Sequence, residues 1–323
     1  MSSDAPASLP LKRPRERPRV RVVAPSSPFP KERLERGVRR LEAAGFVVDD
    51  TSRLLVGGHA YLNGSDAARV AALEEALASD ADIVWLARGG YGLTRLLSSL
   101  SLPAAPLPVV VGFSDATALS AHLFARGARS VHGPLATTLA DEPDASFDHL
   151  VKLLAGQGAG LSLAGLRPLS VPAPQGEVEG SLFAANLCVL THLIGTRSLP
   201  PLAGALLLLE EVGERPYRID RMLTQLLESG ALDGVRGVVL GHLTGCDEPG
   251  AKEGAPSPEE VFIERLAPRG VPVVAGALVG HQAPNFAVPN GARGRLGWGG
   301  REAQLTFVEE LFPAAPARLE RAT

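Results

Sequence analysis

Cysteine and aromatic residues are scarce in this chain of 323 residues. It has 2 cysteines, Cys188 and Cys246, and only 5% of its residues are aromatic. The two cysteines show neither a Cys-x-x-Cys nor a Cys/His spacing, so they offer no set of metal ligands. We therefore expect reduced thiols, a cytoplasmic setting, and no metal ion or other cofactor.

Long apolar runs and an excess of charge of one sign are also missing. No apolar stretch approaches the roughly 20 residues that a membrane-spanning helix needs. The net charge of -3 gives no general attraction to nucleic acid or to an anionic membrane. The first residues contain Arg and Pro but no apolar segment of a secretory signal, so a disordered tail is expected there. A small or peptidic ligand fits this composition best.

The length and the 45% share of hydrophobic residues predict two domains. Apolar strands first alternate with helical segments, which is typical of a parallel sheet with helices on both faces. A stretch rich in Gly and Pro then interrupts the pattern. We expect a tail over 1–18, an α/β domain with a Rossmann-like or flavodoxin-like parallel sheet over 19–153, a linker over 154–180, a smaller α/β domain of the swivelling β/α/β type over 181–313, and a tail over 314–323.

Within the second domain, three segments suggest specific elements. Residues 181–195, SLFAANLCVLTHLIG, are expected to form a helix. Residues 204–230 are expected to form a strand, a loop and a helix, and residues 291–309 a hairpin.

Ser114 is the candidate nucleophile. The segment VVVGFSDATALSAHL, residues 109–123, passes from an apolar strand through a tight turn into a helix. A serine on such a corner points its hydroxyl outward beside the N–H groups of the helix start, which is the geometry of an activated nucleophile. The small residues Gly112 and Ala116 stand two positions to either side of it. The alternative is a serine that merely caps the helix.

A glycine-rich loop, ARGGYG, follows the preceding apolar strand. Its glycines, Gly89, Gly90 and Gly92, let backbone N–H groups approach a ligand closely. One of these groups, together with the N–H of Asp115, could form an oxyanion hole. A phosphate-binding loop is less suitable because neither the Walker pattern nor G-x-G-x-x-G is present. A plain turn remains open as a third interpretation.

A base and an acid must come from downstream. His242 and His281 both follow strands, and His281 is better placed because a long loop rich in Asn and Pro follows it. Glu210 ends a run of four leucines, where a strand would present it at the sheet edge. In a Ser–His–Glu set, neutral His281 would take the proton of Ser114, and Glu210 would fix the imidazole tautomer. Other acids are expected to pair with arginines instead: Glu211, Glu214 and Asp220, with Arg215, Arg218 or Arg221.

Seven motifs occur together, in the order found in the LD-carboxypeptidase family of serine peptidases: YLNGSD, ARGGYGLTRLL, GFSDATAL, VHGP, EEVGERPYRIDRML, GHLTG and GHQAPNFAVPNG. This family includes the muramoyl-tetrapeptide carboxypeptidases and the peptidases that give immunity to microcin C. The resemblance covers about residues 19–313. It implies a two-domain enzyme with a Ser–His–Glu triad, matched by position to Ser114, His281 and Glu210. It also implies the backbone N–H groups of Gly90 and Asp115 as oxyanion donors.

The resemblance implies a murein peptide as substrate, with release of terminal D-alanine from the tetrapeptide during cell-wall recycling, and it favours a homodimer. Two alternatives stay open: a microcin-immunity peptidase that cleaves acyl-sulfamoyl nucleosides, and a non-catalytic protein that binds peptidoglycan fragments. Candidates for reading the substrate are Arg88, Tyr91 and Tyr217, although packing or surface pairing would explain them equally well.

One departure from the family pattern stands before Asn186. Ala184 and Ala185 replace a glycine pair there. Their methyl groups could narrow the cleft or alter the contact between domains, which bears on substrate preference rather than on the chemistry.

Overall fold

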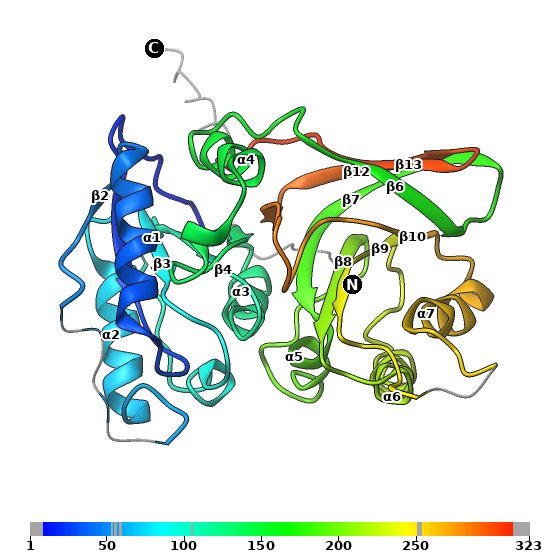
Figure 1. Ribbon diagram of the computed structural model, residues 1–323, viewed down its shortest axis with the longest axis horizontal. Coiled ribbons are helices and arrows are strands. Elements are labelled where there is room, and N and C mark those ends of the chain that lie inside the picture. The colour runs from blue at the N-terminus through cyan, green and yellow to red at the C-terminus, as the bar shows by residue number, and fades with distance from the viewer. Residues whose placement is uncertain are drawn as a thin grey trace, which may run out of the picture.

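Two β-sheets lie side by side in the molecule; helices cover the first, and the second closes into a barrel (Figure 1). This computed structural model describes residues 9–312 apart from residues 53, 55, 56, 58, 59, 105 and 251–253. The two halves meet along α3 (Ala116–Phe124), α5 (Leu187–Thr191) and β7 (Gln175–Asn186). The expected two-domain α/β arrangement is confirmed.

The first sheet has the strand order β11-β5-β4-β3-β1-β2. Its neighbours are parallel except β11, which is antiparallel to β5. The central strands β3 and β4 are buried along their whole length, as expected of a parallel sheet that is covered on both faces. The strands are β1 (Arg19–Val23), β2 (Val47–Val48), β3 (Ile83–Leu86), β4 (Val109–Gly112), β5 (Ser130–His132) and β11 (Val288–Asn290).

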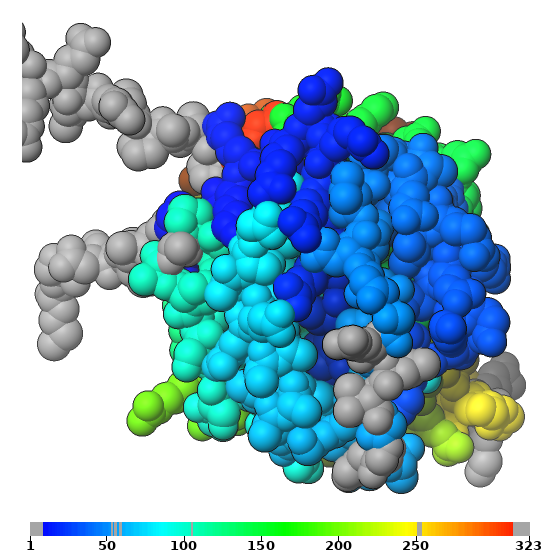
Figure 2. All heavy atoms as spheres, turned by 90° about the vertical axis from the view of Figure 1, so that its left-hand side faces the viewer, coloured from blue at the N-terminus to red at the C-terminus, as the bar shows by residue number. Residues whose placement is uncertain are grey.

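Alternate residues of the central strands belong to two separate cores. Trp85 packs with side chains of α1 and α4, whereas Val84 and Leu86 pack with side chains of α2 and α3. The surface that this half presents on the side away from the barrel is built mostly from the segments coloured blue to cyan (Figure 2). Its remaining elements are α1 (Lys31–Ala43), α2 (Asp66–Ala78), α4 (Asp144–Leu154) and the 3-10 helices η1 (Leu93–Arg95) and η2 (Leu139–Asp141).

The barrel has the closed order β10-β6-β13-β12-β7-β8-β9. Each of its strands contributes to one apolar cluster, including Leu206 and Phe307, that fills the interior. Residues between these, such as Leu207 on β8, pack instead in the core shared with α6 and α7. The further elements are β6 (Ser162–Ser170), β8 (Ala205–Val212), β9 (Gly237–Thr244), β10 (Val273–Ala275), β12 (Arg293–Gly299), β13 (Glu302–Phe307), α6 (Pro216–Glu228), α7 (Pro258–Leu266) and the 3-10 helix η3 (Ala267–Arg269).

The helix expected over 181–195 is wrong in its first part. Strand β7 continues to Asn186, and only the short helix α5 follows. Leu182 belongs to the core inside the barrel and Phe183 to the core outside it, so the strand is apolar on both faces. A continuous apolar run of this kind cannot be told from a buried helix by periodicity. The strand, loop and helix expected over 204–230 are confirmed as β8 and α6, and the hairpin over 291–309 as β12 and β13.

The linker expected over 154–180 needs correction, because it contains β6 and the first part of β7, both paired in the barrel. Register shifts against β13 and β10 interrupt the pairing of β6, and a glycine at positive φ, Gly165, stands within it, so its sequence lacks regular alternation. The domain boundaries themselves stay a prediction.

The chain ends differ in part from expectation. Residues 1–8 and 314–323 lie outside the described residues. Residues 9–18, expected in the first tail, are fastened to the first half of the molecule. Leu11 forms a parallel β-bridge with Leu107 and packs against the apolar core. The Arg- and Pro-rich composition of this segment gave no indication of these contacts. None of the helices described here is long and apolar enough to cross a bilayer.

Candidate active site

Ser114 lies on the corner between β4 and α3, with a φ of 64°. It is the one described non-glycine residue in this left-handed region, which is costly for an L-residue and usually marks a functional constraint. Its surroundings are tight: a Cβ on Gly89 would lie 3.1 Å from Ser114 Oγ, and a Cβ on Gly112 would lie 3.0 Å from the Cβ of Ala116. The small residues read from the sequence therefore make room for the corner and its hydroxyl.

His281 joins Ser114 to Glu210. Its Nε2 lies 3.1 Å from Ser114 Oγ, and its Nδ1 lies 2.6 Å from Glu210 Oε2. A carboxylate only accepts hydrogen bonds, so in the neutral ring Nδ1 carries the proton and Nε2 accepts from the serine hydroxyl. The ring packs edge-on against Phe113, with 4.8 Å between the ring centres. This arrangement can remove a proton from Ser114.

Glu210 is fully buried at the end of the leucine run in β8. Glycines on two segments leave room for its side chain. A Cβ on Gly241 would lie 3.1 Å from the Cβ of Glu210, and a Cβ on Gly280 would lie 2.8 Å from its Oε2. Gly280 also has a φ of 125°, so glycine is required at this position for two reasons. The residue before His281 thus lets the carboxylate and the imidazole approach each other.

The rival acids have other partners. Glu211 is buried and accepts hydrogen bonds from Asn186 Nδ2 at 3.0 Å and from the backbone N–H groups of Cys188 and Val212, so the expected pairing with an arginine is wrong for it. The reason is the start of α5, whose N–H groups attract a carboxylate. Glu214 pairs with Arg218 at 3.3 Å, as expected. Asp220 pairs with Arg265 at 3.4 Å rather than with one of the three arginines named from the sequence.

Asp115 connects the serine corner to the glycine-rich loop. Its carboxylate accepts hydrogen bonds from Ser26 Oγ at 2.6 Å and from the backbone N–H of Leu93 at 3.0 Å. Burial raises the pKa of this carboxyl, while these hydrogen bonds act in the opposite direction. The side chain of Asp115 therefore fixes the loop whose Gly90 N–H is a candidate oxyanion donor.

Gly90 has a φ of 96°, and a side chain there would collide with the hydroxyl of Ser27. Ser27 Oγ accepts a hydrogen bond from the backbone N–H of Tyr91 at 3.2 Å, and the N–H of Ser27 donates to the carbonyl of Gly89 at 3.3 Å. The loop is thus held on both sides of Gly90. Sequence reasoning missed Ser26 and Ser27, although both lie in the turn after β1, which ends at Val23.

The predicted substrate-reading residues make contacts outside this group. Arg88 donates to the backbone carbonyl of Pro28. The exposed ring of Tyr91 lies beside that of Tyr61, with 6.0 Å between the ring centres. The hydroxyl of Tyr217 accepts a hydrogen bond from Arg218 Nε at 3.2 Å. Their role in substrate binding stays a prediction.

His242 does not join the Ser114 group. It lines a hollow of about 420 Å3, together with Thr244 at the end of β9 and Gln282 next to His281. Its Nδ1 is buried and has no hydrogen-bond partner in the described part of the chain. Burial is the main cause that lowers the pKa of His242, and the neighbouring His281 acts in the same direction.

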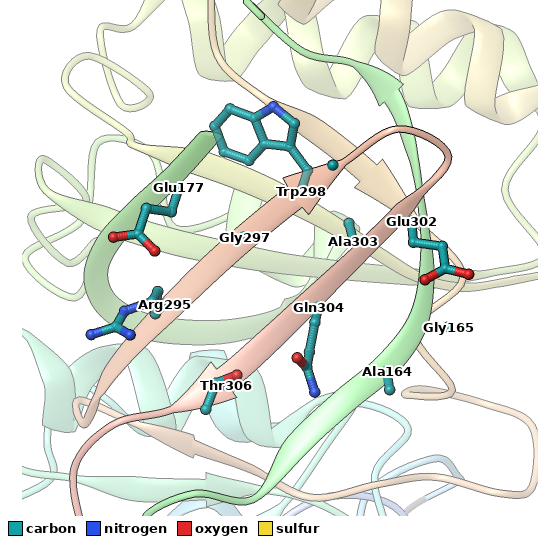
Figure 3. A pocket seen from close by; sticks show the side chains of 11 residues that line it. Ala164, Gly165, Glu177, Arg295, Gly297, Trp298, Glu302, Ala303, Gln304 and Thr306 are labelled. Carbon is teal, nitrogen blue, oxygen red and sulfur yellow. The ribbon is translucent and has the colours of Figure 1, made fainter. Parts of the chain in front are cut away.

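A second hollow lies over β6, β7, β12 and β13 (Figure 3). It measures about 620 Å3, and its lining, all from described residues, includes none of the predicted site residues. Figure 3 shows Trp298 toward one end of it and Thr306 toward the other. In the ranges that the structure describes, no three His, Cys, Asp or Glu side chains are grouped to hold a metal ion.

The alanine pair before Asn186 lies in the core. Ala184 and Ala185 are both fully buried, the first inside the barrel and the second in the core outside it. The backbone N–H of Ala184 donates to Asn290 Oδ1 at 2.7 Å. The extra methyl groups therefore fill the interior and do not narrow an open cleft.

Comparison with known proteins gives matches along most of the chain. The LD-carboxypeptidase N-terminal domain matches residues 20–133, and the LD-carboxypeptidase C-terminal domain matches residues 179–296. A murein tetrapeptide carboxypeptidase from Pseudomonas aeruginosa is 36% identical over 283 residues, which cover 84% of this chain and 91% of that protein.

Two further proteins extend the comparison. The microcin C7 self-immunity protein of Escherichia coli is 25% identical over 315 residues, covering 88% of this chain and 90% of that protein. The crystal structure of a muramoyltetrapeptide carboxypeptidase from Oxalobacter formigenes superposes with a TM-score of 0.79 at 28% identity, covering 91% of this chain and 100% of that chain.

Proposed function

The chain belongs to the LD-carboxypeptidase family, and from this premise we propose that it is a serine carboxypeptidase acting on murein tetrapeptide. That it is a carboxypeptidase, and so a hydrolase, rests on the family and on its named relatives. The proposal adds the nucleophile, the base and the bond that is cleaved. The observation that carries it is the contact chain from Ser114 through His281 to Glu210, with distances of 3.1 and 2.6 Å.

In the first proposed step, Ser114 Oγ attacks the carbonyl carbon of the scissile amide while His281 Nε2 takes the hydroxyl proton. Glu210 accepts the hydrogen bond from Nδ1 and stabilises the imidazolium that forms. The oxygen of the tetrahedral intermediate accepts hydrogen bonds from the backbone N–H groups of Gly90 and Asp115. The C–N bond then breaks, the amine takes the proton from Nε2, and an acyl-enzyme on Ser114 remains.

In the second step, His281 Nε2 takes a proton from water, whose oxygen attacks the acyl carbon. The ester bond to Ser114 breaks, and Oγ takes the proton back from Nε2. The products are a tripeptide with a free carboxylate and the released amino acid, and the enzyme returns to its starting state. Neither step requires a metal ion or a cofactor.

The proposed substrate bond joins an L-configured centre to terminal D-alanine in murein tetrapeptide, as in cell-wall recycling. Support comes from the relatives named for this substrate and from a net charge of -3, which gives no general attraction to nucleic acid. Arg88, Tyr91 and Tyr217 are the proposed contacts to the peptide and its terminal carboxylate. A cytoplasmic homodimer is part of the same proposal.

A microcin-immunity activity is the second candidate because one relative over most of the chain has that name. Such an enzyme would cleave an acyl-sulfamoyl nucleoside, and a flat aromatic surface would help it to bind the base. Both tryptophans are buried, whereas the rings of Tyr61 and Tyr91 are exposed. The higher identity to the murein tetrapeptide carboxypeptidase, 36% against 25% for the immunity protein, favours the murein peptide.

The test is incubation of the purified protein with L-Ala-γ-D-Glu-meso-diaminopimelate-D-Ala, with its all-L terminal analogue, and with an acyl-sulfamoyl adenosine. We expect mass spectrometry to show loss of D-alanine from the first compound alone. Cleavage of the nucleoside with the tetrapeptide intact would favour the second candidate. Binding of a murein fragment without turnover would identify a non-catalytic binding protein.

A further inference from the structure

Glu142 is a buried carboxylate from the first half of the molecule, between η2 and α4, that reaches the loop of His281. Its Oε2 accepts hydrogen bonds from the backbone N–H of Asn285 and from Ser146 Oγ, each at 2.8 Å. The residue is 7% exposed. Glu142 and Asn285 are 143 positions apart in the sequence, so no local sequence pattern predicts this contact.

Asn285 also connects Glu142 to Gly280, the residue before His281. Its side-chain oxygen accepts a hydrogen bond from the backbone N–H of Gly280 at 2.9 Å, and Asn285 is itself only 2% exposed. Gly280 is also the residue that packs against the carboxylate of Glu210. A buried path of hydrogen bonds therefore runs from Glu142 to the backbone that carries His281.

The same loop is fastened to the first half at its far end. His149 on α4 contacts the carbonyl of Ala287 through Nε2 at 3.0 Å, and β11 pairs with β5 in the first sheet. A carbonyl oxygen only accepts, so Nε2 of His149 donates this hydrogen bond, and burial lowers the pKa of the ring. Ser114 follows β4 of the first sheet, whereas Glu210 lies on β8 of the barrel. The loop of His281 spans the two, and contacts from α4 and the turn before it fix the loop relative to the serine.

We propose that Glu142 is a positioning residue: through Asn285 and Gly280 it holds His281 within hydrogen-bond distance of Ser114. This inference rests on the proposed function, since it concerns the reaction of the same serine. Glu142 touches none of the proposed reacting atoms, so its effect is on geometry alone.

The surroundings of Glu142 support a role beyond filling space. A buried carboxylate is costly to keep, and burial raises the pKa of this one. Arg40, the nearby cation, donates to the backbone carbonyl of Glu142, while the carboxylate oxygen Oε2 accepts from the neutral donors of Asn285 and Ser146. A neutral acceptor of the same shape would satisfy these donors, so a Glu142→Gln variant should preserve the loop.

The experiment measures the rate at which a fluorophosphonate labels Ser114, together with kcat and KM for the murein tetrapeptide. The variants are Glu142→Ala, Glu142→Gln, Asn285→Ala and the double alanine variant. Asp141→Ala is the matched control because Asp141 is the adjacent acid but pairs with Arg33 and Arg36 on α1. Thermal unfolding and near-UV circular dichroism check that each variant is folded.

We expect Glu142→Ala to lower the labelling rate and kcat by about tenfold to a hundredfold with little change in KM, because small displacements of catalytic groups cost this much. Glu142→Gln should recover most of the rate, and Asp141→Ala should retain it. Asn285→Ala should match Glu142→Ala, and the double variant should lose little more than either single one, since both act through one path.

Equal labelling rates for Glu142→Ala and Asp141→Ala would overturn the inference, as would independent losses that multiply in the double variant. A wild-type protein that is not labelled at Ser114 would overturn the proposed function, and the inference with it. Labelling of the wild type, with Glu142→Ala labelled equally fast, would overturn the inference alone. If Glu142→Ala fails to fold, Asn285→Ala, which keeps the backbone contact to Glu142, decides by the same comparison.

Discussion

Glu210 and Glu211 are neighbours in β8, yet their carboxylates bind different parts of the molecule. Glu210 Oε2 lies 2.6 Å from His281 Nδ1, whereas Glu211 accepts hydrogen bonds from Asn186 and from the start of α5. Both residues are buried, with exposed fractions of 0% and 2%. The two adjacent acids therefore have separate partners, and the proposed function assigns only Glu210 to the chemistry.

Exchange of each glutamate for glutamine tests this separation. Glu210→Gln should lower kcat by about a thousandfold or more, because an amide neither selects the right imidazole tautomer nor stabilises the imidazolium. Glu211→Gln should keep the rate within about tenfold but lower the free energy of unfolding by about 1–3 kcal/mol, since its amide group faces backbone donors. Steady-state kinetics and urea unfolding measure the two effects. A larger loss of rate at Glu211 than at Glu210 would contradict the assignment.

The two strand-end histidines should differ in the same way. His281→Ala removes the group that contacts both Ser114 and Glu210, so kcat should fall by about a thousandfold or more. His242→Ala should act mainly on stability and lower the free energy of unfolding by about 1 kcal/mol. Rates and unfolding curves of both variants, measured in one buffer, check this. Equal losses of kcat in the two variants would show that His242 also takes part in the reaction.

Gly90→Ala should damage the proposed oxyanion hole. The new methyl group would collide with Ser27 Oγ, and the backbone would have to leave its φ of 96°, which moves the N–H group. We expect kcat to fall by about a hundredfold, as for loss of one oxyanion donor. Gly45→Ala is the control, since Gly45 has a similar φ of 91° but no neighbour within 4 Å of the added carbon. It should cost stability without a loss of kcat, and an equal loss of kcat would reject the role of Gly90.

Two buried histidines predict how stability depends on pH. Burial, and then the charge of Arg126, lower the pKa of His122 to about 4; burial, and then His281, lower that of His132 to about 3. Unfolded histidine titrates near 6.5, so unfolding takes up protons between this value and the folded pKa. The stabilisation is complete above pH 6.5 and is lost as the pH falls through that window.

His122→Gln tests the pH dependence, because glutamine can still hydrogen-bond to Ser198 Oγ but does not titrate in this range. Below pH 6.5, each such histidine lowers the free energy of unfolding by up to about 1.4 kcal/mol per pH unit. Urea unfolding at pH 7, 6 and 5 should therefore show a shallower loss for His122→Gln than for the wild type. Parallel curves for the two proteins would mean that folding does not lower the pKa of His122.

The central parts of the candidate site could be predicted from the sequence because each depends on a short local pattern. The corner at Ser114 follows from a strand, a small-residue turn and a helix, and Glu210 follows from the end of an apolar run. The family resemblance then matched Ser114, His281 and Glu210 to the three members of a triad. The parallel sheet was predictable for the same reason, since its strands are short apolar runs between helices.

Long-range contacts could not be predicted in this way. The strand β7 is apolar on both faces, and only its barrel partners distinguish it from a helix. The hydrogen bond from Asn285 to Glu142 joins residues far apart in the chain, and neither residue has a local signal. The hydrogen bonds of the buried Glu211 depend on the start of α5 at Leu187. A helix expected from residue 181 onward places this start wrongly.

The most direct test of the account is the Ser114→Ala variant assayed on murein tetrapeptide. The substitution removes one partly buried hydroxyl and leaves Glu210 and His281 in their contact, so the unfolding temperature should change little. Release of D-alanine should fall by at least about a thousandfold, because loss of one member of a catalytic unit removes covalent catalysis. A folded Ser114→Ala protein that releases D-alanine at the wild-type rate would contradict the serine mechanism.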